Sequence, residues 1–417
     1  MKNIVSGMIY LGIIGLIMLI ILMVIAILNK QVVIFQFTEN DNYELTEIKS
    51  EKPKISNPTS SNHSAEETGS PDITTTEVNE KPIVNDSSVY YDGDLELPIN
   101  GATGYASVDV TVFAEDFSSA VTTLKAGAAF LIRQESGDWW QISVDGKDGW
   151  VDHNYCMINL PDVIPSIIYD NTNVYQSLFR SSGERIPNIT GQRLYSYTNG
   201  DYDGKRGRVY NERLQKYEYI VPVLYSMSKV ICKAQSIALQ NGETLVIYEG
   251  FRPYSVQIKV AEELQKFANE EPYIRAGINT RPWSIGWFIS TSVSNHQNGY
   301  AIDTSLANAI ESSIVTMVTG KYKYIQIESY FEYYMPTPIH ELSMEAAVYK
   351  SPNSKVFSDA MNENQHAQDL QKYCMDAGLT PLASEWWHFN DENTNRNIKK
   401  RSNGNYEILD CLSVPPS

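Results

Sequence analysis

The chain has 417 residues and a formal net charge of −17, with 42% hydrophobic and 11% aromatic residues. This length suits two or three domains with connecting segments better than one core. The strong negative charge argues against binding to nucleic acid or to an anionic lipid surface, because both partners are themselves negatively charged.

An apolar segment lies close to the amino terminus. Residues 8–28 are a nearly continuous run of Ile, Leu, Met and Val, and no charged residue lies between Asn3 and Asn29. A helix of about 20 apolar residues spans the ~30 Å hydrocarbon core of a bilayer. A cleaved signal peptide has a shorter apolar region of about 7–15 residues and a small-residue cleavage site, which does not follow here. The sequence therefore predicts an uncleaved transmembrane helix at residues 4–28, with an orientation that the flanking charges barely determine.

Residues 39–100 are dominated by Ser, Thr, Asn, Glu, Pro and Lys. They include 14 acidic and 4 basic residues, so their net charge of −10 is more than half of the total. Such a composition buries too little apolar surface to offset the entropy of ordering the chain. We expect a disordered acidic linker that holds the folded part away from the membrane.

Residues 101–160 have a compact β pattern, in which short apolar runs alternate with turn signals. Asp145-Gly146 and Asp148-Gly149 are dipeptides typical of hairpin turns. The rhythm, together with Gly149-Trp150-Val151 and Tyr155, resembles the bacterial SH3-like domain. The resemblance implies a small all-β barrel that holds cell-wall peptides or glycans, and so a contact with peptidoglycan.

Residues 161–417 mix helical and strand patterns, which predicts an α+β domain. Thr244–Phe251 is rich in β-branched and aromatic residues, as in a strand. Apolar residues follow at helical spacing from Pro253 onward, which predicts an amphipathic helix. A second helix is expected over residues 359–377, ending at Gly378.

The four cysteines are far apart in the sequence and form no Cys-x-x-Cys pair. This spacing excludes a thiolate zinc knot and the usual redox pair. We interpret them as small buried hydrophobic residues, although an extracellular location would permit a disulfide bond between some pair of them. They are Cys156, Cys232, Cys374 and Cys411.

Two short motifs carry the residue types of a catalytic zinc site. The first contains His296 and Asp303, and the second contains Glu385 and His388. A catalytic zinc takes about three His, Asp or Glu ligands and leaves one position for water. His296, Asp303 and His388 meet that requirement for Zn2+. Glu385 lies three residues before His388, where its carboxylate can act as the general base that takes the proton of the water.

Each of these residues alone has an ordinary explanation, such as a helix cap, a surface charge or a satisfied core histidine. We interpret His153 and His366 in that way. The joint pattern Ser-x-His-x-x-Gly-x-Ala-x-Asp, followed by Glu-x-x-His, resembles the zinc D-Ala-D-Ala peptidases, which include VanX-type dipeptidases and VanY-type carboxypeptidases. The resemblance covers about residues 169–390 and predicts a zinc D,D-peptidase domain at residues 161–417.

Two further residues are implied by this resemblance. Gly250-Phe251-Arg252-Pro253 resembles the arginine-proline element of the family, which implies that Arg252 stabilises the negative charge of the tetrahedral intermediate. A fixed guanidinium suits an oxyanion for independent reasons, because it stays charged at any working pH. Ser294 resembles the serine near the substrate carboxylate, although it could simply cap a turn.

The sequence leaves the specificity open between two activities. The form Glu-Trp-Trp-His-Phe at residues 385–389 is similar to the dipeptidases, whereas carboxypeptidases more often have Glu-Pro-Trp-His. Dipeptidases also have an aspartate that binds the free amino group, and His340 stands at that position here. Glu341 could substitute for it, or the preference for a free amino end is lost.

The prediction is a membrane-anchored zinc metallopeptidase that hydrolyses D-Ala-D-Ala in cell-wall peptides or their precursors. We place it in the cell membrane as a single-pass protein with its catalytic domain outside the cytoplasm. The alternatives are a D,D-carboxypeptidase acting on longer stem peptides, a zinc peptidase of another specificity, and a non-enzymatic wall-binding protein. The last would be marked by a missing ligand or base, and none is missing.

Overall fold

The computed structural model describes residues 94–144, 146–170, 174–176, 180–181, 184–185, 193–196 and 208–417. The predicted anchor at residues 4–28 and linker residues 39–93 lie outside this part of the chain. Across the described ranges, no helix combines the length and the apolar character that crossing a membrane requires.

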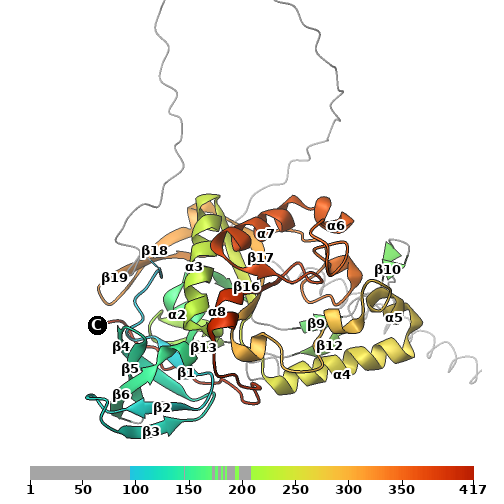
Figure 1. Ribbon diagram of the computed structural model, residues 1–417. Helices are drawn as coiled ribbons and strands as arrows, with labels where there is room; N and C mark the ends of the chain where they lie inside the picture. Colours follow the sequence, from blue (N-terminus) through green and yellow to red (C-terminus); the bar gives the residue numbers. More distant parts are fainter. Residues whose placement is uncertain are drawn as a thin grey trace, which may run out of the picture. The chain divides into compact units, whose positions relative to one another are not determined.

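Seven short strands between residues 103 and 159 form an antiparallel sheet with one strand from later in the chain (Figure 1). In sheet order they are β15 (Pro222–Leu224), β7 (Cys156–Asn159), β1 (Thr103–Ala106), β4 (Ala129–Ser136), β5 (Trp139–Val144), β6 (Lys147–Asp152), β2 (Val110–Phe113) and β3 (Ala120–Leu124). Trp140 and Ile142 of β5 are buried while their neighbours are half-buried, the alternation of a strand with one face on a core. The predicted β structure of residues 101–160 is confirmed, and its likeness to an SH3 barrel stays a prediction.

Only one of the two predicted hairpin turns is a turn. Gly146 adopts φ 71° between β5 and β6. Gly149, in contrast, lies inside β6, opposite Ile142. A Cβ atom at Gly149 would come within 2.5 Å of Val112 and 2.7 Å of the Phe113 carbonyl. This glycine is therefore explained by close strand packing rather than by a turn.

The end of the predicted linker is ordered, which corrects its boundary at residue 100. Leu95 and Leu97 are fully buried, and Ile99 is nearly so. The amide of Leu97 donates to the carbonyl of Val163 at 3.1 Å. These alternating apolar residues pack as an extended segment on the core. The average composition of residues 39–100 conceals them, because polar residues outnumber them.

The two regions that the sequence separates at residue 160 share a sheet and a core. Strand β15 pairs with β7 across that boundary. Near the carboxyl end of the chain, the Val414 amide donates to the carbonyl of Gly101 at 2.8 Å. One hydrophobic cluster includes both Trp140 of the first sheet and Phe389 of the second. The first sheet therefore packs against the second sheet in one hydrophobic core and does not form a separate domain among the described residues.

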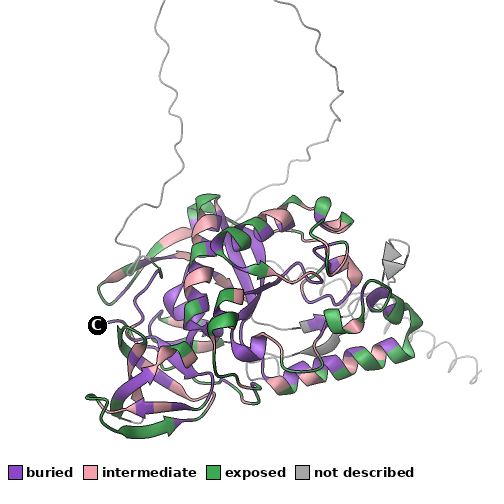
Figure 2. Ribbon diagram, viewed as in Figure 1, coloured by how far each residue is buried: buried purple, intermediate pink, exposed green. Residues whose placement is uncertain are grey.

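The second sheet holds the motifs. In order its strands are β21 (Thr380–Pro381), β22 (His388–Asn390), β17 (Ala301–Ala309), β16 (Glu243–Glu249) and β8 (Ile168–Tyr169), and β20 (Tyr330–Glu332) also pairs with β17. All pairs are antiparallel except β16 with β8, which is parallel. Strands β16 and β17 are buried almost throughout, so they form the rigid centre of this region (Figure 2).

Helices pack around this sheet and its loops. The longer ones are α3 (Tyr225–Gln240), α4 (Tyr254–Glu270), α5 (Pro272–Ile278) and α7 (Gln365–Ala377), and the short ones are α2 (Leu160–Val163), α6 (Asp359–Asn362) and α8 (Glu392–Asn397). The amphipathic helix predicted after Pro253 is confirmed as α4. Its buried residues include Val256, Val260 and Leu264, while its opposite side is exposed (Figure 2).

The helix predicted over residues 359–377 is divided in two. Asn364 caps the amino end of α7, because its side chain accepts a hydrogen bond from the Ala367 amide at 2.9 Å. Gly378 ends α7 with φ 118°, as predicted. The break after α6 thus comes from a local side-chain bond that a hydrophobic pattern does not reveal.

Shorter strands and turns complete the described chain. They are β9 (Val174–Gln176), β10 (Arg180–Ser181), β11 (Glu184–Arg185), β12 (Arg193–Ser196), β13 (Arg208–Asn211), β14 (Lys216–Tyr219), β18 (Ile314–Thr319) and β19 (Tyr322–Ile327), with 3-10 turns η1 (His153–Tyr155), η2 (Ile285–Trp287), η3 (His296–Asn298), η4 (Glu311–Ser313) and η5 (Met344–Ala346).

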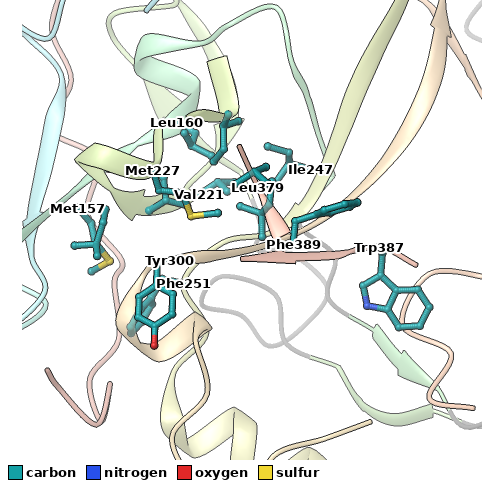
Figure 3. Packing of buried hydrophobic residues seen from close by; sticks show 14 of the residues in the cluster. Met157, Leu160, Val221, Met227, Ile247, Phe251, Tyr300, Leu379, Trp387 and Phe389 are labelled. Atoms are coloured by element: carbon teal, nitrogen blue, oxygen red, sulfur yellow. The ribbon is translucent and has the colours of Figure 1, made fainter. Parts of the chain in front are cut away.

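The main core contains side chains from both sheets, including Met157, Ile247 and Phe389 (Figure 3). All four cysteines are free thiols, and all but Cys411 are buried. The interpretation of the cysteines as small buried residues is therefore confirmed for three of them.

Candidate metal centre and cavity

Three adjacent strands place a row of polar side chains on the second sheet. Asp303 in β17 pairs with Glu249 in β16 on one side and with His388 in β22 on the other. Directly opposite residues of adjacent strands lie close together on the same face of a sheet. Strand pairing therefore brings two predicted metal ligands together and adds a carboxylate, Glu249, that the motifs did not include.

His296 reaches the same place from the turn before β17. It begins η3, and Gly299 after this turn has φ 75°, a left-handed conformation that glycine adopts without strain. The chain then enters β17, which carries Asp303. The glycine in the first motif thus reverses the chain between the two ligands.

The three predicted ligands meet through one atom each. His388 Nδ1 lies 3.0 Å from Asp303 Oδ1 and 3.1 Å from His296 Nε2. His296 Nε2 lies 3.4 Å from the same Asp303 oxygen. All three side chains are at least nine-tenths buried. The atoms form a compact triangle, which is one face of a possible coordination site.

Hydrogen bonds behind the histidines determine which ring nitrogens face this triangle. His296 Nδ1 donates to the carbonyl of Gly250 at 2.7 Å, so in the neutral ring Nε2 has a free lone pair. His388 Nε2 donates to Asn390 Oδ1 at 3.0 Å, and Asn295 Nδ2 donates to the same oxygen at 2.7 Å. Neutral His388 therefore presents the lone pair of Nδ1. Three lone pairs converge, an arrangement that a cation stabilises.

The size and chemistry of the triangle fit zinc. Zinc bonds to nitrogen and oxygen are about 2.0–2.1 Å long, so tetrahedral ligand atoms lie about 3.3 Å apart. The observed separations of 3.0–3.4 Å are close to this value. Two imidazoles and one carboxylate are also a donor set that suits zinc. His296, Asp303 and His388 are therefore the residues that would hold the ion.

The protonation of these groups follows from burial and charge. Burial, together with the charge of Arg252, lowers the pKa of His296 and keeps it neutral. Burial alone would raise the pKa of Asp303, but the neighbouring histidines hold it well below 3.8. Burial would likewise lower the pKa of His388, but its hydrogen bond to Asp303 raises it instead. Asp303 is thus ionised and able to act as a ligand.

Glu385 lies beside the triangle without being part of it. Its Oε2 is 3.8 Å from His388 Nδ1, and its side chain is 8% exposed. Burial raises the pKa of Glu385 to about 8. A positive ion at the triangle would lower this pKa, because an opposite charge favours the carboxylate. Glu385 therefore has the position and the basicity expected of a proton acceptor.

Arg252 is fixed at the edge of the same site. Its Nε donates to Glu249 Oε2 at 2.9 Å, and its Nη2 lies 3.4 Å from Asp303 Oδ2. Gln257 accepts from the remaining arm of the guanidinium. Burial alone would lower the pKa of Arg252, but Glu249 raises it, so the side chain is a permanent cation. The proposed role with an oxyanion stays a prediction.

All six predicted residues line one cavity of about 270 Å3. Ser294 is one of its lining residues, and its buried Oγ has no hydrogen-bond partner among the described residues. The cavity lining includes apolar residues, most of them from the loop before the first motif. They are Trp287, Phe288, Ile289, Val293, Leu342 and Leu382.

The structure places His340 and Glu341 differently from the expectation. Neither of them lines the cavity as the structure describes it. His340 lies in a turn with φ 59°, so the segment is not extended, and its Nε2 is 3.1 Å from Asp303 Oδ2. Glu341 is fully buried and accepts from Ser343 Oγ at 2.8 Å. His340 therefore contacts a metal-ligand candidate rather than a substrate position.

Three contributors to the site were missed at the sequence level. Glu249 ends β16 three positions before Arg252. This short separation could have indicated an ion pair between the two side chains. Asn390 lies two residues after His388, the spacing that returns a strand to the same face. Tyr175 donates to Glu249 and stacks on His340, and no motif indicated it. No protein-family model matches this chain, and no curated protein matches it either.

Proposed function

We propose that this chain is a zinc peptidase that hydrolyses D-Ala-D-Ala in cell-wall peptides or their precursors. The observation that carries the proposal is the convergence of His296 Nε2, Asp303 Oδ1 and His388 Nδ1 beside Glu385 in one cavity. The motif resemblance supplies the substrate class. A surface cluster of the same residue types would lack the hydrogen bonds that orient the donor atoms.

The residues that line the cavity have separate roles in the proposed amide hydrolysis. Zinc held by His296, Asp303 and His388 would supply Lewis-acid polarisation of the scissile carbonyl and of the attacking water. Glu385 takes a proton from that water and passes it to the leaving amine, because its carboxylate lies next to the ligand triangle. Arg252 offers a fixed positive charge to the developing oxyanion. Ser294 offers an unpaired hydroxyl to the substrate carboxylate.

The lining of the cavity favours substrates with an acylated amino end. Among the described lining residues, the carboxylates are Asp303, a metal-ligand candidate, and Glu385, the proposed proton acceptor beside it. A free ammonium group buried there would lack a partner, which costs several kcal/mol. The apolar part of the lining, which includes Trp287 and Val293, each 38% exposed, suits an acyl group of a longer peptide. This supports the carboxypeptidase alternative over a strict dipeptidase.

The remaining alternatives differ in what they require of the site. A non-enzymatic wall-binding protein needs neither zinc nor Glu385, yet both ligand set and base are complete. A zinc peptidase of another specificity would share the metal centre and differ in the peptide it cleaves. Product analysis on D-Ala-D-Ala and on a full pentapeptide stem separates these cases, since a binding protein releases no D-alanine from either.

We also propose that residues 4–28 anchor the chain in the cell membrane with the catalytic part outside, and that the first sheet contacts peptidoglycan. The apolar run and the acidic linker support the first statement, and the SH3-like pattern supports the second. Protease added to intact cells should release the catalytic part. Complete protection, in cells whose known outer proteins are cut, would reverse the topology. Pull-down with purified peptidoglycan tests the contact.

A further inference from the structure

The second oxygen of Asp303 is held from behind the ligand triangle. While Oδ1 faces the two metal-binding histidines, Oδ2 lies 3.1 Å from His340 Nε2 and 3.4 Å from Arg252 Nη2. A carboxylate has only acceptor positions, so His340 Nε2 carries the proton and donates it. The carboxylate plane is therefore fixed by a histidine that does not line the cavity.

His340 is held in place at some energetic cost. Its side chain is 1% exposed and its φ of 59° lies in the left-handed region, which a residue with a Cβ rarely adopts. Its ring stacks on Tyr175 with centroids 4.6 Å apart and meets Trp387 edge-on at 5.9 Å. Strained residues persist where the surroundings determine them, which occurs mainly at functional sites.

We propose that His340 is a positioning residue that orients Asp303 for metal binding. The inference rests on the zinc site proposed above. The bond from Nε2 to Oδ2 directs Oδ1 toward His296 and His388. Partners of this kind raise the basicity of a ligand and reduce its freedom before the ion arrives.

A competing explanation is a second metal ion, because Glu249, Asp303 and His340 also bring one donor atom each within 4.8 Å of one another. Arg252 argues against it. Its guanidinium contacts the carboxylates of both Glu249 and Asp303, where a second ion would have to bind. A divalent ion would then lie against a fixed positive charge. The structure favours one ion per chain, with Arg252 and His340 filling the far side of Asp303.

The test measures the zinc affinity of the full chain by chelator competition. It compares the variants His340→Leu and His340→Gln with the wild type. Both variants accept the same backbone strain, but only the glutamine amide can donate to Asp303. We expect His340→Leu to weaken zinc binding by about 10–100-fold, and His340→Gln to recover most of that loss. His366→Ala is the matched control, because His366 also stacks on a tyrosine and does not line the cavity.

Wild-type zinc binding tests the proposed function, whereas the differences among variants test the role of His340. Equal affinity of wild type and His340→Leu would overturn the role of His340, and two zinc ions per wild-type chain would overturn the exclusion of a second site. If the leucine variant does not fold, His340→Asn replaces it. Asparagine tolerates positive φ, and its shorter amide does not reach Oδ2, so the same loss of affinity is expected.

Discussion

Arg252 and Glu249 form a buried ion pair at the edge of the cavity. Arg252 Nε lies 2.9 Å from Glu249 Oε2, and the two side chains are 5% and 0% exposed. A buried charge that loses its partner is left unsolvated, which is far more costly than replacing the whole pair by neutral groups. Arg252 is the one Lys or Arg among the described residues that line the cavity. Its position is fixed by Glu249, which does not line the cavity.

This pair predicts strong coupling between two substitutions. Arg252→Met alone should lower the free energy of unfolding by about 3–5 kcal/mol, because Glu249 is left buried without its counter-ion. Adding Glu249→Gln should recover most of the loss. Urea denaturation of the single and double variants measures the coupling, and simple additivity would contradict the account. The stabilised double variant should still lose about 10²–10³ in kcat, because the cation near the oxyanion is gone.

The position of Glu385 predicts a variant that binds metal but does not turn over. Glu385→Gln keeps the shape of the side chain and removes the proton acceptor, so kcat should fall by about 10² or more while zinc content is unchanged. Metal analysis and a D-alanine release assay on the same sample check both parts. The exposed acid Glu363→Gln is the control and should behave as wild type. Near-normal turnover with metal bound would move the base elsewhere.

Glu96 predicts a pH dependence of stability that is separate from the metal centre. Burial raises the pKa of Glu96 to about 7 from 4.5, although Ser166 donates two hydrogen bonds to it. The folded protein therefore binds this proton more tightly than the unfolded chain. The contribution is fully present below pH 4.5 and is lost as the pH rises to about 7, a change of roughly 3 kcal/mol.

Glu96→Gln mimics the protonated side chain and should remove this dependence. Its stability relative to wild type should therefore increase between pH 4.5 and pH 8, as measured by urea denaturation at each pH. The exposed Glu212→Gln provides the matched control. A constant difference between Glu96→Gln and wild type at all pH values would show that Glu96 is not buried, and so that residues 94–100 do not pack on the core.

The cavity lining predicts a preference among substrates. An N-acylated peptide that ends in D-Ala-D-Ala should be cleaved with at least the kcat/KM of the free dipeptide, because no described lining carboxylate is left for an ammonium group. Parallel assays on the two compounds measure this. Cleavage of the free dipeptide alone would support a strict dipeptidase. In that case a residue outside the described lining binds the amine.

Much of this site could be predicted from the sequence because its ligands lie in two short motifs with fixed spacing. Asp303 and His388 are cross-strand neighbours, so the pairing of β17 with β22 brings one ligand from each motif to the same place. Glu385 was predictable for the same reason, since it lies three positions before a ligand in the sequence.

The second layer of the site could not be predicted in this way. His340 reaches Asp303 through a left-handed turn, and Tyr175 stacks on it from a strand far away in sequence. Neither contact has a local pattern. Strand β15 joins the first sheet across the expected boundary at residue 160, because Pro222 pairs with Asn159, and no local pattern reveals such long-range pairing.

The catalytic zinc centre is tested by titrating the metal-free protein with zinc while measuring the release of D-alanine from an N-acylated peptide ending in D-Ala-D-Ala. We expect no release without zinc, a rise in proportion to added zinc, and a plateau at about one equivalent per chain. Release that does not depend on zinc, or no release at any zinc concentration, would contradict the assignment of His296, Asp303 and His388 to a catalytic metal centre.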